Sequence, residues 1–127
     1  MTMVSGRRWR RGLRKVQAQA SCVANNTAVT LHDLSTGRTA VIRKLHVYNA
    51  NTGASTRVQL GTGAAGAFTQ VFPDIFLPAG VDLELTEDQL LEWEFTADIT
   101  VEATVAAAAP SNVIVMAEVE EFMGPSG

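Results

Sequence analysis

Apolar and polar residues alternate with a period of two through most of this chain, and this pattern constrains the fold more than any other feature. In "VDLELT", Val81, Leu83 and Leu85 fall on one face of an extended strand and the polar residues between them fall on the other. The same alternation recurs in "LEWEFT", "DITVEATVA" and "TRVQL". It is typical of strands that bury one face.

Segments rich in β-branched and aromatic residues predict further strands at about 27–32, 39–48, 67–72 and 113–122, which brings the total to about eight. Stretches of Gly, Pro and Asn such as "NANTG" and "LPAG" separate them as turns. Only "TEDQLL" begins like a helix, and it allows one turn at most. We therefore expect an all-β fold, an antiparallel β-sandwich of jelly-roll or Ig-like type.

The N-terminal stretch "SGRRWRRGLRK" carries six positive charges and a tryptophan, although the whole chain has a net charge of −3. Residues 16–127 alone sum to 4 − 13 = −9. We therefore predict a basic N-terminal arm at 1–20, a sandwich at 21–123 that folds without the arm, and a flexible tail at 124–127. The residues predicted to contact a partner are Arg7, Arg8, Trp9, Arg10, Arg11, Leu13, Arg14 and Lys15.

Three classes of partner compete for such an arm: an acidic protein surface, nucleic acid and a membrane surface. Arg and Trp are frequent anchors at protein interfaces, and the body of a second copy is itself acidic, which favours protein docking. Arginine clusters with an aromatic residue also suit nucleic acid. Gly12 weakens the helix that membrane adsorption needs, so we expect no membrane contact.

The strand predicted in "VIVMAEVEEF" departs from simple alternation. Ile114 and Met116 occupy the face opposite its core residues, before Glu118 and Glu120 make that face polar and solvated again. Either an arm or loop covers this strand, or it forms a subunit interface, which would also suit Phe68 and Phe72.

The glycine-rich segment "GTGAAG" matches the spacing of a dinucleotide-binding turn, but strand-like sequence follows it where that motif needs a helix. We therefore expect a flexible hairpin loop.

Acid pairs such as Glu92 with Glu94 lie on strand faces expected to be solvated, where nothing raises the pKa of one carboxyl as a glycosidase requires. His32 and His46 lack an activated serine or a set of metal ligands, and Cys22 stands alone. The sequence therefore predicts no enzyme, no cofactor and no metal site.

The order of the basic arm, "VIRKLHVYNANTGASTRVQLGTG", "FTQVFPDIFLPAGVDLELTE", "LLEWEFTADITVEATVA" and "VIVMAEVEEF" resembles small all-β virion proteins of tailed phages, in particular capsid decoration (cement) proteins. The resemblance lies in size, strand order and composition over most of residues 20–123. It implies a non-enzymatic homo-oligomer, a trimer by preference, made in the host cytoplasm and bound to the major capsid protein on the virion surface. Residues Arg7 to Lys15 would then be the clamp.

Two other functions stay open at this point. A nucleic-acid-binding module, or a minor capsid protein inside the shell, would place the same basic arm on the genome. A carbohydrate-binding appendage is the third, because jelly rolls also serve as lectin domains.

Overall fold

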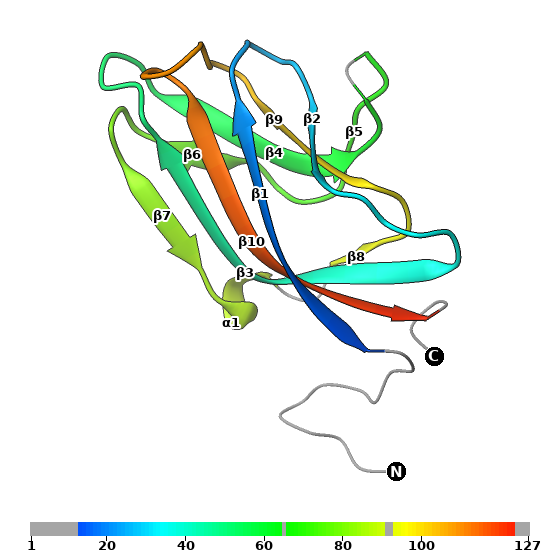
Figure 1. The fold of residues 1–127 in the computed structure, drawn as a ribbon. Coiled ribbons are helices and arrows are strands. Elements are labelled where there is room, and N and C mark those ends of the chain that lie inside the picture. The colour runs from blue at the N-terminus through cyan, green and yellow to red at the C-terminus, as the bar shows by residue number, and fades with distance from the viewer. Residues whose placement is uncertain (1–12, 65, 91–92, 124–127) are drawn as a thin grey trace.

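The computed structural model describes residues 13–64, 66–90 and 93–123, and these form two antiparallel sheets packed face to face (Figure 1). The first sheet contains β1 (Arg14–Cys22), β10 (Val113–Met123), β3 (Arg38–Asn49) and β7 (Asp82–Leu85) in that order, with β8 (Glu94–Phe95) also paired to β3. The second contains β2 (Val29–His32), β9 (Ile99–Ala103), β4 (Thr56–Thr62) and β5 (Thr69–Gln70), with β6 (Ile75–Leu77) also paired to β4.

The strand pairs are nested in the sequence. The first strand pairs with the last and the second with the last but one, while β3 pairs with β7 and β8, and β4 pairs with β5 and β6. This is the pairing order of a jelly roll, in which a strip of antiparallel pairs is rolled into two sheets. The predicted β-sandwich is therefore confirmed, and of the two expected types the topology is the jelly roll. The described residues contain ten strands, and of these β1 and β6 were not predicted.

The core lies between the sheets and contains the predicted inward residues of β4, β9 and β10. For β7 and β8 the predicted burial was wrong in part, because Val81, Leu83 and Trp93 are 40%, 37% and 39% exposed near the edge of the first sheet. Val113, Val115, Ala117 and Val119 of β10 are all buried in it, as predicted. Leu45 and Val47 of β3 share this cluster with Leu60 of β4 and Val101 of β9. Burying such rows on both sheets is the main source of stability in a sandwich.

The one-turn helix α1 (Glu87–Leu90) lies between β7 and β8, where "TEDQLL" predicted it. The Thr86 backbone N–H donates to the Gln89 side-chain oxygen at 3.0 Å, which is one half of a capping box. The buried Leu90 side chain anchors the turn to the core.

The segment "GTGAAG" forms the hairpin between β4 and β5, and the pairs Gly61↔Gln70 and Thr62↔Thr69 close it. Gly63 has a φ of +92°, and a Cβ there would lie 2.2 Å from the Ala67 carbonyl oxygen, so only glycine fits. The glycines thus serve a tight turn, as expected of a hairpin and unlike a nucleotide-binding motif.

The structure does not divide the chain at residue 20. Residues 14–20 belong to β1, which pairs with β10 from Arg14↔Glu121 to Cys22↔Val113 without interruption. The expected arm therefore overlaps the sandwich by most of one strand. Residues 1–12 of the arm and the tail at 124–127 lie outside the described residues.

Candidate partner-binding site

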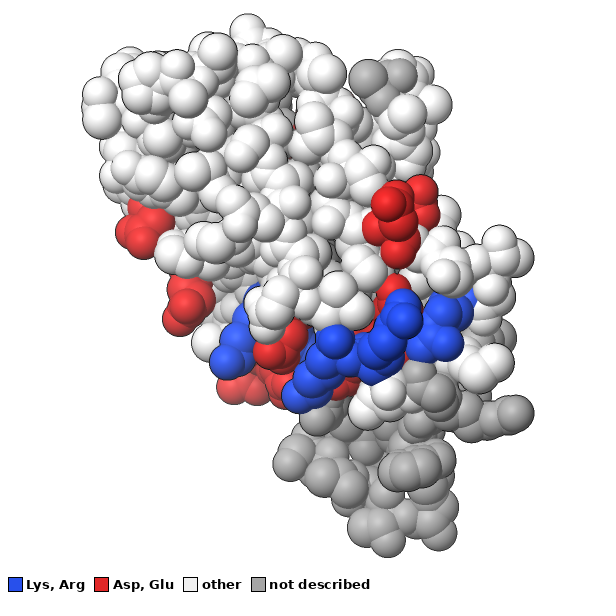
Figure 2. Space-filling model, in the orientation of Figure 1, with Lys and Arg blue, Asp and Glu red and all other residues white. Residues whose placement is uncertain are grey.

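Five of the six described Lys and Arg residues lie at one end of the first sheet, which we call the basic end. They are Arg14, Lys15, Arg38, Arg43 and Lys44. Strand pairing brings them together, because Arg14, Lys15, Arg38 and Lys44 each lie opposite a residue of β10 between Glu118 and Met123. Figure 2 shows the basic side chains as a band near one end of this face, with acidic groups beside them.

Glu121 is the centre of the basic end. Its side chain continues the inward row of β10, at the point where the apolar core stops, and it has no exposed surface. Arg14 Nη2 donates to Glu121 Oε1 at 2.6 Å and Arg38 Nε donates to the same oxygen at 3.0 Å. His32, from β2 of the facing sheet, contacts the other carboxylate oxygen. One buried carboxylate therefore ties together three strands of one sheet and one of the other.

The charge state of Glu121 follows from these partners. Burial by itself would raise the pKa of this carboxyl, but the hydrogen bonds from His32 and Arg14 and their positive charge outweigh burial and lower it below its ordinary value of 4.5. Glu121 is therefore ionised at neutral pH.

The lowered pKa predicts how stability depends on pH. Because the folded pKa lies below the unfolded one, Glu121 stabilises the fold above about pH 4.5, and this contribution disappears as the pH falls through the folded pKa. Glu121→Gln should lower the free energy of unfolding by about 2 kcal/mol at pH 7, the value of a charge-assisted hydrogen bond. Urea unfolding of both proteins between pH 7 and pH 3 should give curves that converge at acidic pH, and a constant difference would contradict this role.

Glu120 and Arg43 form a second pair, on the opposite face of the same sheet. Arg43 is the extra residue of a β-bulge, since Glu118 pairs with Lys44 and Val119 pairs with Ile42. Its Nε and Nη2 both donate to Glu120 Oε1, at 3.0 and 2.8 Å, and the two side chains are 3% and 1% exposed. The expectation that Glu120 is solvated was wrong, because the bulge turns an arginine onto it and both groups are buried.

Only the last three of the predicted arm residues fall within the described part of the chain. Leu13 is half exposed, and Arg14 and Lys15 begin β1 opposite Glu121 and Glu120. Arg7, Arg8, Trp9, Arg10 and Arg11 lie outside the described residues. The chain thus enters the sandwich at the basic end, directly after the basic stretch.

The residues predicted to form a subunit interface lie in two separate places. Ile114 and Met116 are on the outer face of the first sheet, where Met116 is 38% exposed and Ile114 pairs with the exposed Tyr48. Phe72 instead packs against the core, and its ring meets Trp93 edge to face at 6.0 Å between centroids. Phe68 is half-buried in the loop before β5. The structure therefore does not bring the four together.

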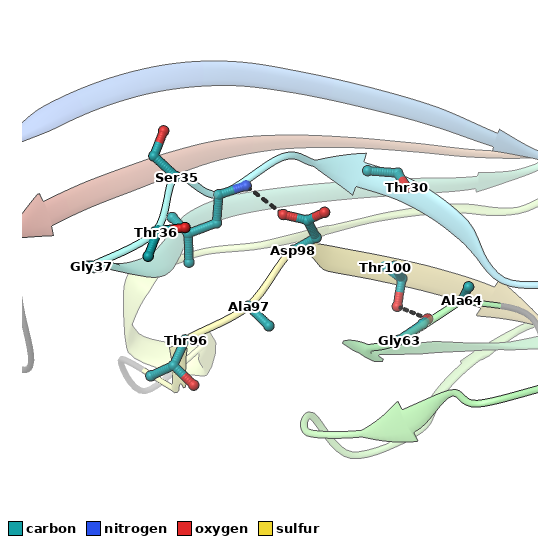
Figure 3. Close-up of a pocket in the computed structure, with 11 residues that line it drawn as sticks. Thr30, Ser35, Thr36, Gly37, Gly63, Ala64, Thr96, Ala97, Asp98 and Thr100 are labelled. Atoms are coloured by element: carbon teal, nitrogen blue, oxygen red, sulfur yellow. Dashed lines mark hydrogen bonds between the residues drawn. The ribbon is translucent and has the colours of Figure 1, made fainter.

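A polar pocket of about 500 Å³ lies where the loops after β2 and β8 meet the β4–β5 hairpin (Figure 3). Five of its eleven lining residues carry a hydroxyl group, and they are Thr30, Ser35, Thr36, Thr96 and Thr100. Asp98 accepts a hydrogen bond from the Leu34 backbone N–H at 2.7 Å, and Thr100 donates to the Gly63 carbonyl at 2.9 Å. The described lining has no aromatic ring on which a sugar could stack, so carbohydrate binding stays a prediction without added support.

Cys22 is fully buried at the end of β1, with its thiol 3.9 Å from the Val101 carbonyl oxygen. Burial raises the pKa of the thiol to about 11, so the reactive thiolate is scarce at neutral pH. Within the part of the chain that the structure describes, no group of three or more His, Cys, Asp or Glu side chains could hold a metal ion. No helix among the described residues is long and apolar enough to cross a membrane.

Neither a protein family model nor a curated protein matches this sequence. Among solved structures, the chain is similar to a protein of the Bacillus endospore appendages, which are described as disulfide-linked pili. The identity is 12%, the TM-score is 0.50, and the match covers 98% of this chain and 100% of the other. This likeness concerns the fold.

Two viral structures match less closely. A chain of the cyanophage Pam1 capsid asymmetric unit matches at 12% identity and a TM-score of 0.44, over 97% of this chain and 93% of the other. A chain of the T13 IBDV viral particle matches at 10% identity and a TM-score of 0.38, over 93% of this chain and 37% of the other. With TM-scores below 0.5, these two matches add nothing to the assignment of the fold.

Sequence reasoning did not find the two carboxylates that organise the basic end. Glu120 and Glu121 are neighbours in a strand, so their side chains must point to opposite faces, and one of them must point inward. A glutamate on the apolar, inward row of a strand is unfavourable unless its charge is paired, so the adjacent glutamates were the sequence signal for a buried charge cluster.

Proposed function

We propose that this chain is a non-enzymatic structural subunit of a virus particle, a decoration or cement protein that self-associates and holds a capsid subunit through its N-terminal residues. The observation that carries the proposal is the position of the basic stretch. It runs straight into edge strand β1, and the start of β1 is fastened by Arg14 to the buried Glu121. Tension on residues 7–13 would therefore pass into β1, a strand whose nine residues all pair with β10, rather than into a loop.

The fold is compatible with this role without establishing it. Jelly rolls serve as viral capsid domains, as lectins and as cupins, so the fold alone does not assign the function and the site has to. The endospore appendage protein offers a second structural precedent, since it belongs to an assembled fibre. Its disulfide linkage has no counterpart at Cys22, because this thiol is fully buried. Subunits of this chain would therefore be held by non-covalent contacts.

Nucleic acid is the alternative partner, and two lysines of the basic end support this alternative. Lys15 and Lys44 form no ion pair with a described residue, so both remain able to contact phosphates. The carboxylates at the same end reduce its positive potential, because Glu121 and Glu120 already pair with three of the arginines. Docking to an acidic protein surface can use the same cations at fixed positions, so we place it first.

The two partners predict different responses to substitution of Trp9. If Trp9 fills a pocket on a protein, Trp9→Ala should weaken binding by about 2 kcal/mol, and Arg11→Ala should cost less. If the partner is duplex DNA, log affinity should fall steeply with log salt, by about 0.9 per neutralised phosphate, and Trp9→Ala should have little effect.

Salt titrations of the full-length protein against emptied phage particles and against duplex DNA separate these cases. Arg57→Ala is the matched charge control, because Arg57 is the described basic residue outside the basic end and its side chain is 60% exposed. Tight DNA binding that ignores Trp9, together with no binding to emptied particles, would overturn the proposal in favour of nucleic acid.

A further inference from the structure

The outer edge of β1 is a long strand edge without a partner. Within the described residues, backbone hydrogen bonds reach this strand only from β10, and no turn or loop bond ends on residues 14–22. Its nine residues pair in continuous register, with neither a bulge nor a proline to protect the edge. Edges of this kind accept a further strand, because their N–H and C=O groups are already aligned for it.

Burial along β1 indicates that an additional strand would fit on both faces. The inward residues Val16, Ala18 and Ala20 are only half-buried, although their counterparts on β10 are fully buried. The outward residues Gln17 and Gln19 are exposed and uncharged. A strand placed beside β1 would therefore cover the apolar row on one side and meet amide groups on the other.

The sequence of β1 is complementary to itself when two copies run antiparallel. We propose that two copies of this chain pair through β1, antiparallel and centred on Ala18. In this register Gln17 faces Gln19 of the second copy, Val16 faces Ala20, and Arg14 and Lys15 face Cys22 and Ser21. Apolar residues then meet apolar residues and amides meet amides. Arg14 and Lys15 of the two copies lie at opposite ends of the paired strands. A parallel arrangement would instead place the basic residues together, and like charges side by side are unfavourable.

This pairing joins two sheets across one two-fold axis, which is the commonest symmetry of protein dimers. It also directs the two N-terminal stretches away from each other, since residue 14 of one copy lies beside residue 22 of the other. If the proposed function holds, such a dimer would bridge two partner surfaces. The pairing does not depend on that function, so it can fail while the docking role stands, and the reverse is also true.

Sedimentation velocity of the full-length protein over a range of concentrations tests the pairing. We expect a reversible association to twice the chain mass of 13.6 kDa. Gln17→Lys combined with Gln19→Lys places ammonium groups opposite each other twice, so it should raise the dimer dissociation constant at least tenfold at low salt. Gln17→Lys combined with Gln19→Glu is the matched control, because it places opposite charges at the same two contacts and should restore or tighten the dimer.

Thermal unfolding at concentrations where all three proteins are monomeric checks that the substitutions leave the fold intact. Both positions are exposed on β1, opposite Glu118 and Met116 of the same chain, so melting temperatures should stay close to that of the unsubstituted protein. A monomer at every concentration would overturn the proposal. A dimer or trimer whose dissociation constant is the same in both double variants would also overturn it.

Discussion

Removal of residues 1–20 is expected to abolish cooperative unfolding of the sandwich, whereas removal of residues 1–12 should preserve it. The longer deletion takes away all but two residues of β1 and turns the central strand β10 into an edge. It also uncovers Val115, Ala117 and Val119 and removes Arg14 from the buried Glu121. The loss should be on the order of the whole free energy of unfolding of a small domain, about 5–15 kcal/mol.

Far-UV and near-UV circular dichroism during heating measures the outcome for both deletions. The shorter deletion is the control, because it removes the same kind of basic sequence and leaves β1 complete. If the protein without residues 1–20 melted within a few degrees of the full-length chain, β1 would be dispensable and residues 14–20 would act as a detachable arm.

Glu120→Gln is expected to cost about 3–5 kcal/mol of folding stability, the usual penalty for removing one charge of a buried ion pair. Arg43 is only 3% exposed and directs two donors at the lost carboxylate, so its guanidinium cannot turn to water without disturbing the bulge. Chemical unfolding of the variant at pH 7 measures the change.

Replacing both members of this pair distinguishes a charge effect from a packing effect. Glu120→Leu with Arg43→Met removes both charges at similar volume and should cost clearly less than the sum of the two single substitutions. Additive effects of the two single changes would show that the pair is not coupled, and the assigned role of the bulge would then be wrong.

The sandwich was predictable because its two sheets each bury one face, so that the alternation in "TRVQL" and "DITVEATVA" records which side meets the core. In "VDLELT" the alternation predicted the strand but not its burial, because β7 lies at the edge of its sheet and leaves Val81 and Leu83 exposed. The nested topology was not predictable in the same way. Ig-like and jelly-roll sandwiches have similar local patterns, and only the pairing of β1 with β10 across the length of the chain distinguishes them.

Strand β1 was missed although "VQAQASC" alternates regularly. Two of its inward residues are alanines, Ala18 and Ala20, which bury little area and do not resemble a strand by composition. The flanking arginines also favoured assigning the whole stretch to an arm. Small inward side chains are consistent with the close approach of β1 to the facing sheet, where Cys22 reaches Val101.

The charge clusters depend on features that sequence periodicity does not contain. The bulge at Arg43 shifts the register by one residue and sets this arginine against Glu120. The contact of His32 with Glu121 joins residues on different sheets. In both cases a long-range geometric coincidence, rather than a local motif, creates the site.

Electron microscopy of virus particles from the source of this chain, prepared with and without the protein, tests most directly whether it is a structural subunit held by its N-terminal residues. We predict sandwich-shaped density at symmetry-related positions on the complete particles, with residues 7–13 extended over a neighbouring subunit and Trp9 in a pocket. Particles that lack this density, while the protein co-purifies with nucleic acid instead, would contradict it.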